Sequence, residues 1–182
     1  MWTRGVDHAL FRPRPEAELA GIYDFPRPIF VNVGRVSVEK NIEAFLDLDL
    51  PGTKVVVGDG PAKKSLEKRY PDAKFVGARF GDELARAYAA ADVFVFPSLT
   101  DTFGNVLLEA LACGVPVAAF PVPGPLDVIK GSGAGVLDTD LRKASLAALD
   151  ISRDRAVEYA AQFTWEECAR IFVEAGTIAK AA

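Results

Sequence analysis

Two acidic side chains lie eight positions apart in the stretch from Ser98 to Val117, where a polar turn joins an apolar strand to an apolar helix. Asp101 precedes the predicted helix and Glu109 lies within it. Amides in the first turn of a helix have no partner inside the helix, and together they form a ready site for an anion. The amides concerned here are those of Gly104, Asn105, Val106 and Leu107. A ligand with a phosphate and several hydroxyl groups would match this arrangement.

The two acids also have a purely structural interpretation. Asp101 could be a charge partner of the helix terminus, and Glu109 an acid at the edge of the core, held by a hydrogen bond. A carboxylate on so apolar a helix needs a partner, because an unpaired buried charge is costly. Glu109 is therefore the stronger candidate for binding hydroxyl groups of a ligand.

Two cations follow another apolar segment, in the sequence Val-Gly-Arg-Val-Ser-Val-Glu-Lys-Asn at 33–41. After Gly34, Arg35 offers a planar fork of donors and Lys40 a mobile ammonium, which together suit a diphosphate. The alternative is a pair of solvated cations that bind nearby glutamates. The turn lacks the Gly-x-Gly-x-x-Gly of a dinucleotide site, and the chain has no Gly-x-x-x-x-Gly-Lys-Ser/Thr loop, which weakens both a dehydrogenase and an ATPase interpretation.

A third motif, Val-Gly-Asp-Gly-Pro at 57–61, has glycines on both sides of Asp59. Glycines permit a tight turn, and Pro61 suits the first position of a helix. We favour turn formation over ligand contact for this motif.

Short apolar segments alternate with helical ones after residue 28, and this alternation predicts an α/β fold with a parallel sheet covered on both faces. The expected strands are Ile29–Val33, Lys54–Val57, Lys74–Val76, Val93–Phe96, Val115–Phe120 and Gly135–Leu137. The expected intervening helices are Val38–Leu48, Ala62–Tyr70, Gly81–Ala90, Asn105–Cys113 and Gly124–Lys130. We expect a doubly wound, Rossmann-like sheet of six strands in the order 3-2-1-4-5-6. Its ligand should bind where the order reverses, between the first and fourth strands.

The chain divides into three parts by composition. Prolines punctuate residues 1–28, which we interpret as a linking segment with a short helix near Glu16–Tyr23. Residues 29–163 form the predicted Rossmann-like domain. Residues 164–182 form a C-terminal helix, since Thr164 followed by Glu167 is a capping box.

Composition excludes several classes of function. The 182 residues carry a net charge of −4, which gives no electrostatic footprint for nucleic acid and argues against a membrane surface. No stretch is long and apolar enough for a transmembrane segment. Cys113 and Cys168 make no disulfide framework, which indicates a reducing, cytoplasmic compartment. His8 is the only histidine, so the chain holds neither a Ser-His-Asp triad nor a multi-histidine metal site.

Taken together, the motifs resemble the C-terminal, donor-binding half of retaining GT-B glycosyltransferases, and most of all the family called glycosyl transferases group 1. The resemblance rests on residues 33–41, 57–61, 75–77, 91–92 and 101–117, and it covers about residues 4–175. Arg-Gly-Val-Asp at 4–7 is similar to that family's link between its two domains.

The resemblance implies roles for the matching positions. Arg35 and Lys40 would hold the donor diphosphate next to Gly34, Glu109 would bind the ribose hydroxyls, and Asp101 would contact the transferred sugar. The family usually has Glu where Asp101 stands. The phosphate and sugar would be lined by the amides of Phe103, Gly104, Asn105 and Val106. No metal and no cofactor is implied, because these cations and the helix start neutralise the diphosphate of the UDP- or GDP-sugar substrate.

The implied reaction is retaining transfer of a hexose to an acceptor held by an N-terminal GT-B domain, which is missing here. We therefore expect the isolated domain to be inactive, and the full-length enzyme to be cytoplasmic or peripheral to the membrane. Two alternatives remain open at this point: one half of a sugar-nucleotide epimerase, and a non-catalytic nucleotide-binding module. An upstream reading frame that encodes a second α/β domain would favour an enzyme over the module.

Overall fold

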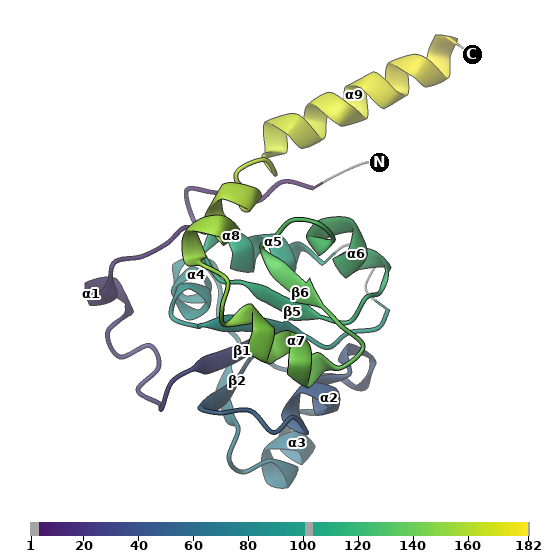
Figure 1. The fold of residues 1–182 in the computed structure, drawn as a ribbon. Coiled ribbons are helices and arrows are strands. Elements are labelled where there is room, and N and C mark those ends of the chain that lie inside the picture. Colours follow the sequence, from purple (N-terminus) through teal and green to yellow (C-terminus); the bar gives the residue numbers. More distant parts are fainter. Residues whose placement is uncertain (1–3, 101–103, 182) are drawn as a thin grey trace.

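The computed structural model describes residues 4–100 and 104–181, with side chains up to residue 174. Its centre is a six-stranded parallel sheet with helices on both faces (Figure 1). The strands are β1 (Ile29–Val33), β2 (Thr53–Val57), β3 (Lys74–Gly77), β4 (Val93–Phe96), β5 (Val117–Ala119) and β6 (Gly135–Leu137). They lie in the order β3-β2-β1-β4-β5-β6, which confirms the predicted doubly wound topology.

Each face of the sheet has its own apolar core, because successive strand residues point to opposite faces. Along β1, Ile29 and Val31 pack into one core and Phe30 into the other. The first core lies under α4 (Gly81–Ala89), α5 (Asn105–Ala112), α6 (Pro123–Ile129) and α8 (Arg153–Ala160). The second lies under α2 (Ile42–Leu46), α3 (Lys63–Arg69) and α7 (Leu141–Ala148). Burial on both sides explains why the central strand β4 is apolar at all four of its residues.

The single helix predicted at Val38–Leu48 is wrong. The chain forms a 3-10 turn, η1 (Val38–Lys40), and then α2, with Asn41 between them at a left-handed φ of 52°. Asparagine tolerates this conformation better than most residues. Its side-chain amide donates to the Pro97 carbonyl at 2.9 Å, so Asn41 joins the loop after β1 to the loop after β4.

Strand β5 is shorter than predicted because its first residues end the preceding helix. Gly114 takes a left-handed φ of 75°, and its amide donates to the Leu111 carbonyl at 2.9 Å. The Val115 amide donates to Ala110 at the same distance. Such bonds satisfy the last carbonyls of a helix, so Val115 belongs to the end of α5 and not to the sheet.

The segment before β1 packs on the domain. It contains α1 (Glu16–Leu19), and Val6 and Phe11 reach the first core at 5% and 8% exposure. The Val6 amide donates to the Phe163 carbonyl at 3.0 Å, next to the start of α9 (Trp165–Ala181). Figure 1 shows α9 projecting away from the sheet.

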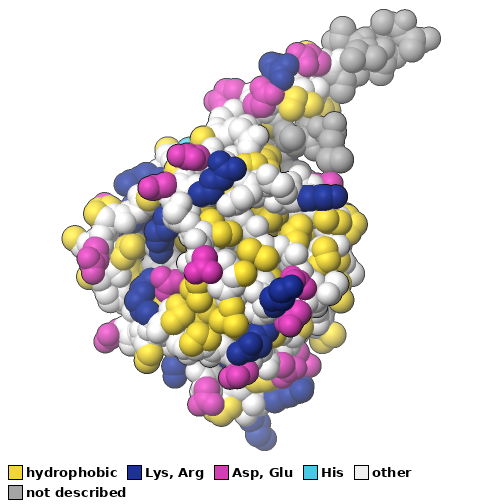
Figure 2. All heavy atoms as spheres, in the orientation of Figure 1, with side chains coloured by type: hydrophobic (Ala, Val, Ile, Leu, Met, Phe, Trp, Pro, Cys, Tyr) yellow, Lys and Arg dark blue, Asp and Glu magenta, His cyan; other side chains and the backbone are white. Residues whose placement is uncertain are grey.

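One half of the predicted capping box is confirmed, since Thr164 Oγ1 accepts from the Glu167 amide at 3.1 Å. The carboxylate of Glu167 binds Arg170. Within the described ranges, no helix is long and apolar enough to cross a membrane. The face seen in Figure 2 mixes acidic and basic side chains, without an extended basic patch.

Candidate functional site

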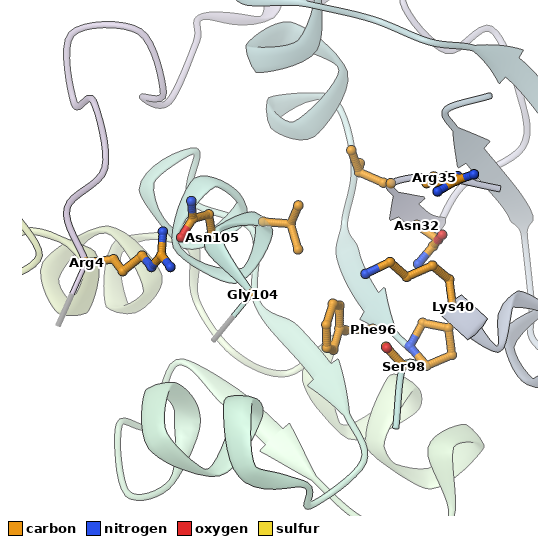
Figure 3. A pocket seen from close by; sticks show the side chains of 12 residues that line it. Arg4, Asn32, Arg35, Lys40, Phe96, Ser98, Gly104 and Asn105 are labelled. Carbon is orange, nitrogen blue, oxygen red and sulfur yellow. The ribbon is translucent and has the colours of Figure 1, made fainter. Parts of the chain in front are cut away.

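A pocket of about 300 Å³ opens at the carboxyl edge of the sheet, between β1 and β4. This is the predicted point where the strand order reverses. Four segments meet there: the end of β1 and the loop after it, the end of β4, the start of α5, and the segment before β1 (Figure 3). The lining residues are Arg4, Asn32, Val33, Gly34, Arg35, Lys40, Phe96, Pro97, Ser98, Gly104, Asn105 and Val106.

The backbone of the loop after β1 packs very closely against the backbone of the loop after β2. A Cβ on Gly58 would lie 1.8 Å from the Gly34 oxygen, and one on Gly60 would lie 2.3 Å from the Val36 oxygen. The Gly34 amide donates to Val57 at 3.0 Å, and Val36 donates to Asp59 at 2.9 Å. The motif at 57–61 therefore shapes the pocket through packing, although none of its residues is among the lining residues.

Arg35 and Lys40 come together in the pocket, as predicted. Arg35 is exposed and Lys40 is half-buried. With Arg4 they make three cations, and no carboxylate occurs among the described residues that line the pocket. A concave wall with one sign of charge concentrates the opposite charge, so this pocket attracts anions.

The start of α5 forms the facing wall. Gly104 precedes the helix at a left-handed φ of 69°, and Asn105 is the first helical residue. The Leu107 amide donates to the Gly104 carbonyl at 2.9 Å, so the prediction that this amide is open to a ligand is wrong. The predicted site residues Asp101 and Phe103 lie outside the described residues.

Glu109 lies one helical turn beyond Asn105 and is not among the residues that line the pocket. Its carboxylate accepts a hydrogen bond from the Tyr88 hydroxyl at 2.9 Å. Burial raises the pKa of Glu109, and the hydrogen bond from Tyr88 partly offsets that rise. The contact of Glu109 with a ligand stays a prediction.

Besides Arg4, two polar residues of the pocket, Asn32 and Ser98, were missed in the sequence. Asn32 is 5% exposed, and its side-chain amide donates to the Val95 carbonyl at 3.0 Å, which ties β1 to β4. Ser98 is 1% exposed, and its buried Oγ has no hydrogen-bond partner among the residues that the structure describes. A polar residue inside an apolar strand was a usable signal for Asn32. Ser98 carries no such signal, because a serine after a strand is ordinary turn chemistry.

The described residues contain no group of three or more His, Cys, Asp or Glu side chains placed to hold a metal ion. Cys113 and Cys168 are free thiols, and both are buried.

Comparison with known proteins assigns the family. The sequence model named Glycosyl transferases group 1 matches residues 27–151. The chain belongs to this family. Among curated relatives, it is 41% identical over 140 residues to a GDP-mannose-dependent alpha-mannosyltransferase of Mycobacterium tuberculosis, covering 75% of this chain and 37% of that protein. It is 40% identical over 138 residues to the sulfoquinovosyl transferase SQD2 of Arabidopsis thaliana, covering 71% of this chain and 27% of that protein.

Solved structures show the same fold. Sucrose-phosphate synthase from Thermosynechococcus elongatus superposes with a TM-score of 0.79 and 27% identity, covering 98% of this chain and 52% of that one. Anabaena Alr3699/HepE in complex with UDP gives a TM-score of 0.76 at 22% identity, covering 95% of this chain and 56% of that one. The fold is therefore the Rossmann-like fold of GT-B glycosyltransferases. This group 1 chain spans only 27% and 37% of the length of the two curated relatives.

Proposed function

We propose that this domain binds a nucleoside diphosphate sugar, UDP- or GDP-hexose, as the donor half of a retaining glycosyltransferase. The observation that carries the proposal is the pocket at the strand-order reversal, which has three cations and no carboxylate among its described lining residues. The relatives support the donor class, since one is described as GDP-mannose-dependent and another was solved with UDP. Their names favour a transferase over the epimerase and the non-catalytic module.

In the proposed reaction, the bond between the anomeric carbon and the diphosphate oxygen breaks, and its electron pair stays on that oxygen. The acceptor hydroxyl oxygen forms the new bond to the anomeric carbon, and its proton passes to the leaving diphosphate. Arg35 and Lys40 offset the charge that develops on the leaving diphosphate. The amides at the start of α5, at Gly104 and Asn105, add their donors and the positive end of the helix dipole.

The remaining roles concern positioning. Gly34 leaves open space beside the diphosphate, because a Cβ there would meet nothing within 4 Å. Glu109 accepts hydrogen bonds from the ribose hydroxyls, and Asp101 contacts the sugar, with the amides of Phe103 and Val106 beside it. No metal is required in this scheme, since cationic side chains and amides neutralise the diphosphate.

The acceptor is proposed to bind to an N-terminal GT-B domain outside this chain. Relatives are longer than this chain by a wide margin, which supports a second domain. Retention of the sugar's anomeric configuration is part of the same proposal.

Titration calorimetry of Arg35→Ala with UDP and with GDP tests the assignment. A charge-assisted contact contributes about 1.5–3 kcal/mol, so the affinity should fall about ten- to a hundredfold. Arg69→Ala is the matched control, because Arg69 is exposed, pairs with Glu43 and is not among the residues that line the pocket. Equal affinities of wild type and Arg35→Ala for both nucleotides would reject the proposed function.

A further inference from the structure

Arg4 lines the same pocket from a segment that the sequence motifs assigned only to a link. In Figure 3, Arg4 and Asn105 lie at one end of the pocket, and Arg35 and Lys40 lie toward the other. The four residues therefore line one shared space, and Arg4 lies beside the start of α5 (Figure 3).

The backbone at Arg4 is held in place by the junction of α8 and α9. The next residue, Gly5, approaches this junction so closely that a Cβ would lie 2.5 Å from the Trp165 nitrogen. Val6 follows with its amide bonded to the Phe163 carbonyl at 3.0 Å and its side chain 5% exposed.

A turn then fixes the direction of the segment. The Asp7 carboxylate accepts from the Ala9 amide at 2.9 Å, and the Asp7 carbonyl accepts from Phe11 at 2.8 Å. The residues that follow Arg4 are thus held in place by these contacts, and the long side chain of Arg4 reaches the pocket from this segment.

Arginine suits phosphoryl groups in a way that other cations do not. Its guanidinium is planar and always charged, and it can donate two parallel hydrogen bonds to two oxygens of one group. A ligand with two linked phosphates presents such oxygens on more than one side. The pocket has cations toward both of its ends, Arg4 at one and Arg35 and Lys40 at the other (Figure 3).

We infer that Arg4 is a binding residue of this pocket, which donates to phosphoryl oxygens of the bound nucleoside diphosphate from the side opposite Arg35 and Lys40. The inference rests on the proposed function, and it adds a third cation whose position depends on the α8–α9 junction. The ligand would then be held by three segments far apart in the sequence.

Calorimetry with UDP and GDP on wild type, Arg4→Ala, Arg4→Lys and Arg12→Ala tests this inference. Arg4→Ala should weaken binding about tenfold, at the lower end for a charged contact because Arg4 is exposed. Arg4→Lys keeps the charge and should recover part of the affinity. Arg12 belongs to the same segment but bonds to the Pro13 carbonyl outside the pocket, so Arg12→Ala should bind as wild type does.

The outcomes separate the inference from the proposed function. If Arg35→Ala weakens binding and Arg4→Ala stays within twofold of wild type, the inference is wrong and the proposed function stands. If wild type binds neither nucleotide, the proposed function itself fails. Thermal unfolding of Arg4→Ala should match wild type, which would show that its weaker binding does not come from a damaged fold.

Discussion

Gly58→Ala should destabilise the domain by about 3 kcal/mol, because it forces apart the two loops that shape the pocket. The added Cβ would lie 1.8 Å from the Gly34 oxygen, and contacts below 3.0 Å are not tolerated, so the loops must separate by at least 1.2 Å. That movement strains the bonds from Gly34 to Val57 and from Gly58 to Gly77, each of which contributes about 1 kcal/mol. Alanine at the Gly58 φ of 153° adds about 1–2 kcal/mol.

Urea unfolding and calorimetry with UDP measure the two consequences. The free energy of unfolding should fall by about 3 kcal/mol, and the melting temperature should fall by about 6–12 °C for a chain of this size. Affinity for UDP should fall as well, because Arg35 follows Gly34 directly. Gly131→Ala is the control, since Gly131 has a left-handed φ of 75° but open space around its Cβ position. Surface substitutions usually change the free energy of unfolding by no more than about 0.5 kcal/mol. If the free energies of unfolding of Gly58→Ala and Gly131→Ala differ by less than this, close loop packing does not stabilise the site.

Two further predictions concern the buried acid and the isolated chain. Glu109 has a raised pKa in the folded protein, so its contribution to stability is full below its unfolded value of 4.5 and is lost as the pH rises through the folded value. Glu109→Gln should therefore have a higher melting temperature than wild type at pH 7, and this difference in melting temperature should shrink toward pH 4. Its affinity for UDP or GDP should fall. A difference in melting temperature that does not depend on pH would contradict the reasoning. Purified residues 1–182 should bind donor weakly and transfer no sugar, because holding the acceptor hydroxyl against the reactive carbon can supply about 7–11 kcal/mol of the barrier. Sugar transfer by the purified chain in a radiolabelled-donor assay would contradict the proposed acceptor domain.

The central strands β1 and β4 were predictable because burial on both faces leaves an apolar signal in the sequence. The strand order was predictable because strands alternate with helices along the chain. The bounds of β1, β4 and β6 agree with the sequence prediction residue for residue. The break at Asn41 was not predictable from periodicity, because it depends on a hydrogen bond to Pro97, 56 positions away.

The candidate site also contains some residues that the sequence predicted and others that it did not. The sequence predicted that Arg35, Lys40 and the start of α5 meet at one place, because they lie shortly after a predicted strand or near the start of a predicted helix, and all of them line the pocket. The position of Arg4 at the pocket was missed because only the packing of Gly5 and Val6 on the α8–α9 junction brings it there. Such a placement depends on tertiary contacts and leaves no local pattern.

The pairing of β1 with β4 has a consequence for when the pocket forms during folding. Val31 pairs with Val55 of β2, 24 positions later, whereas Phe30 pairs with Val93 of β4, 63 positions later. Contacts between distant parts of a chain close slowly, because the intervening loop must lose entropy first. The pocket straddles this long-range junction, with lining residues both before residue 41 and after residue 95. A nascent chain that has reached only β3 contains Arg35 and Lys40 but not the wall of the pocket that faces them. In a refolding experiment, nucleotide binding would therefore begin only when the two halves of the sheet have joined.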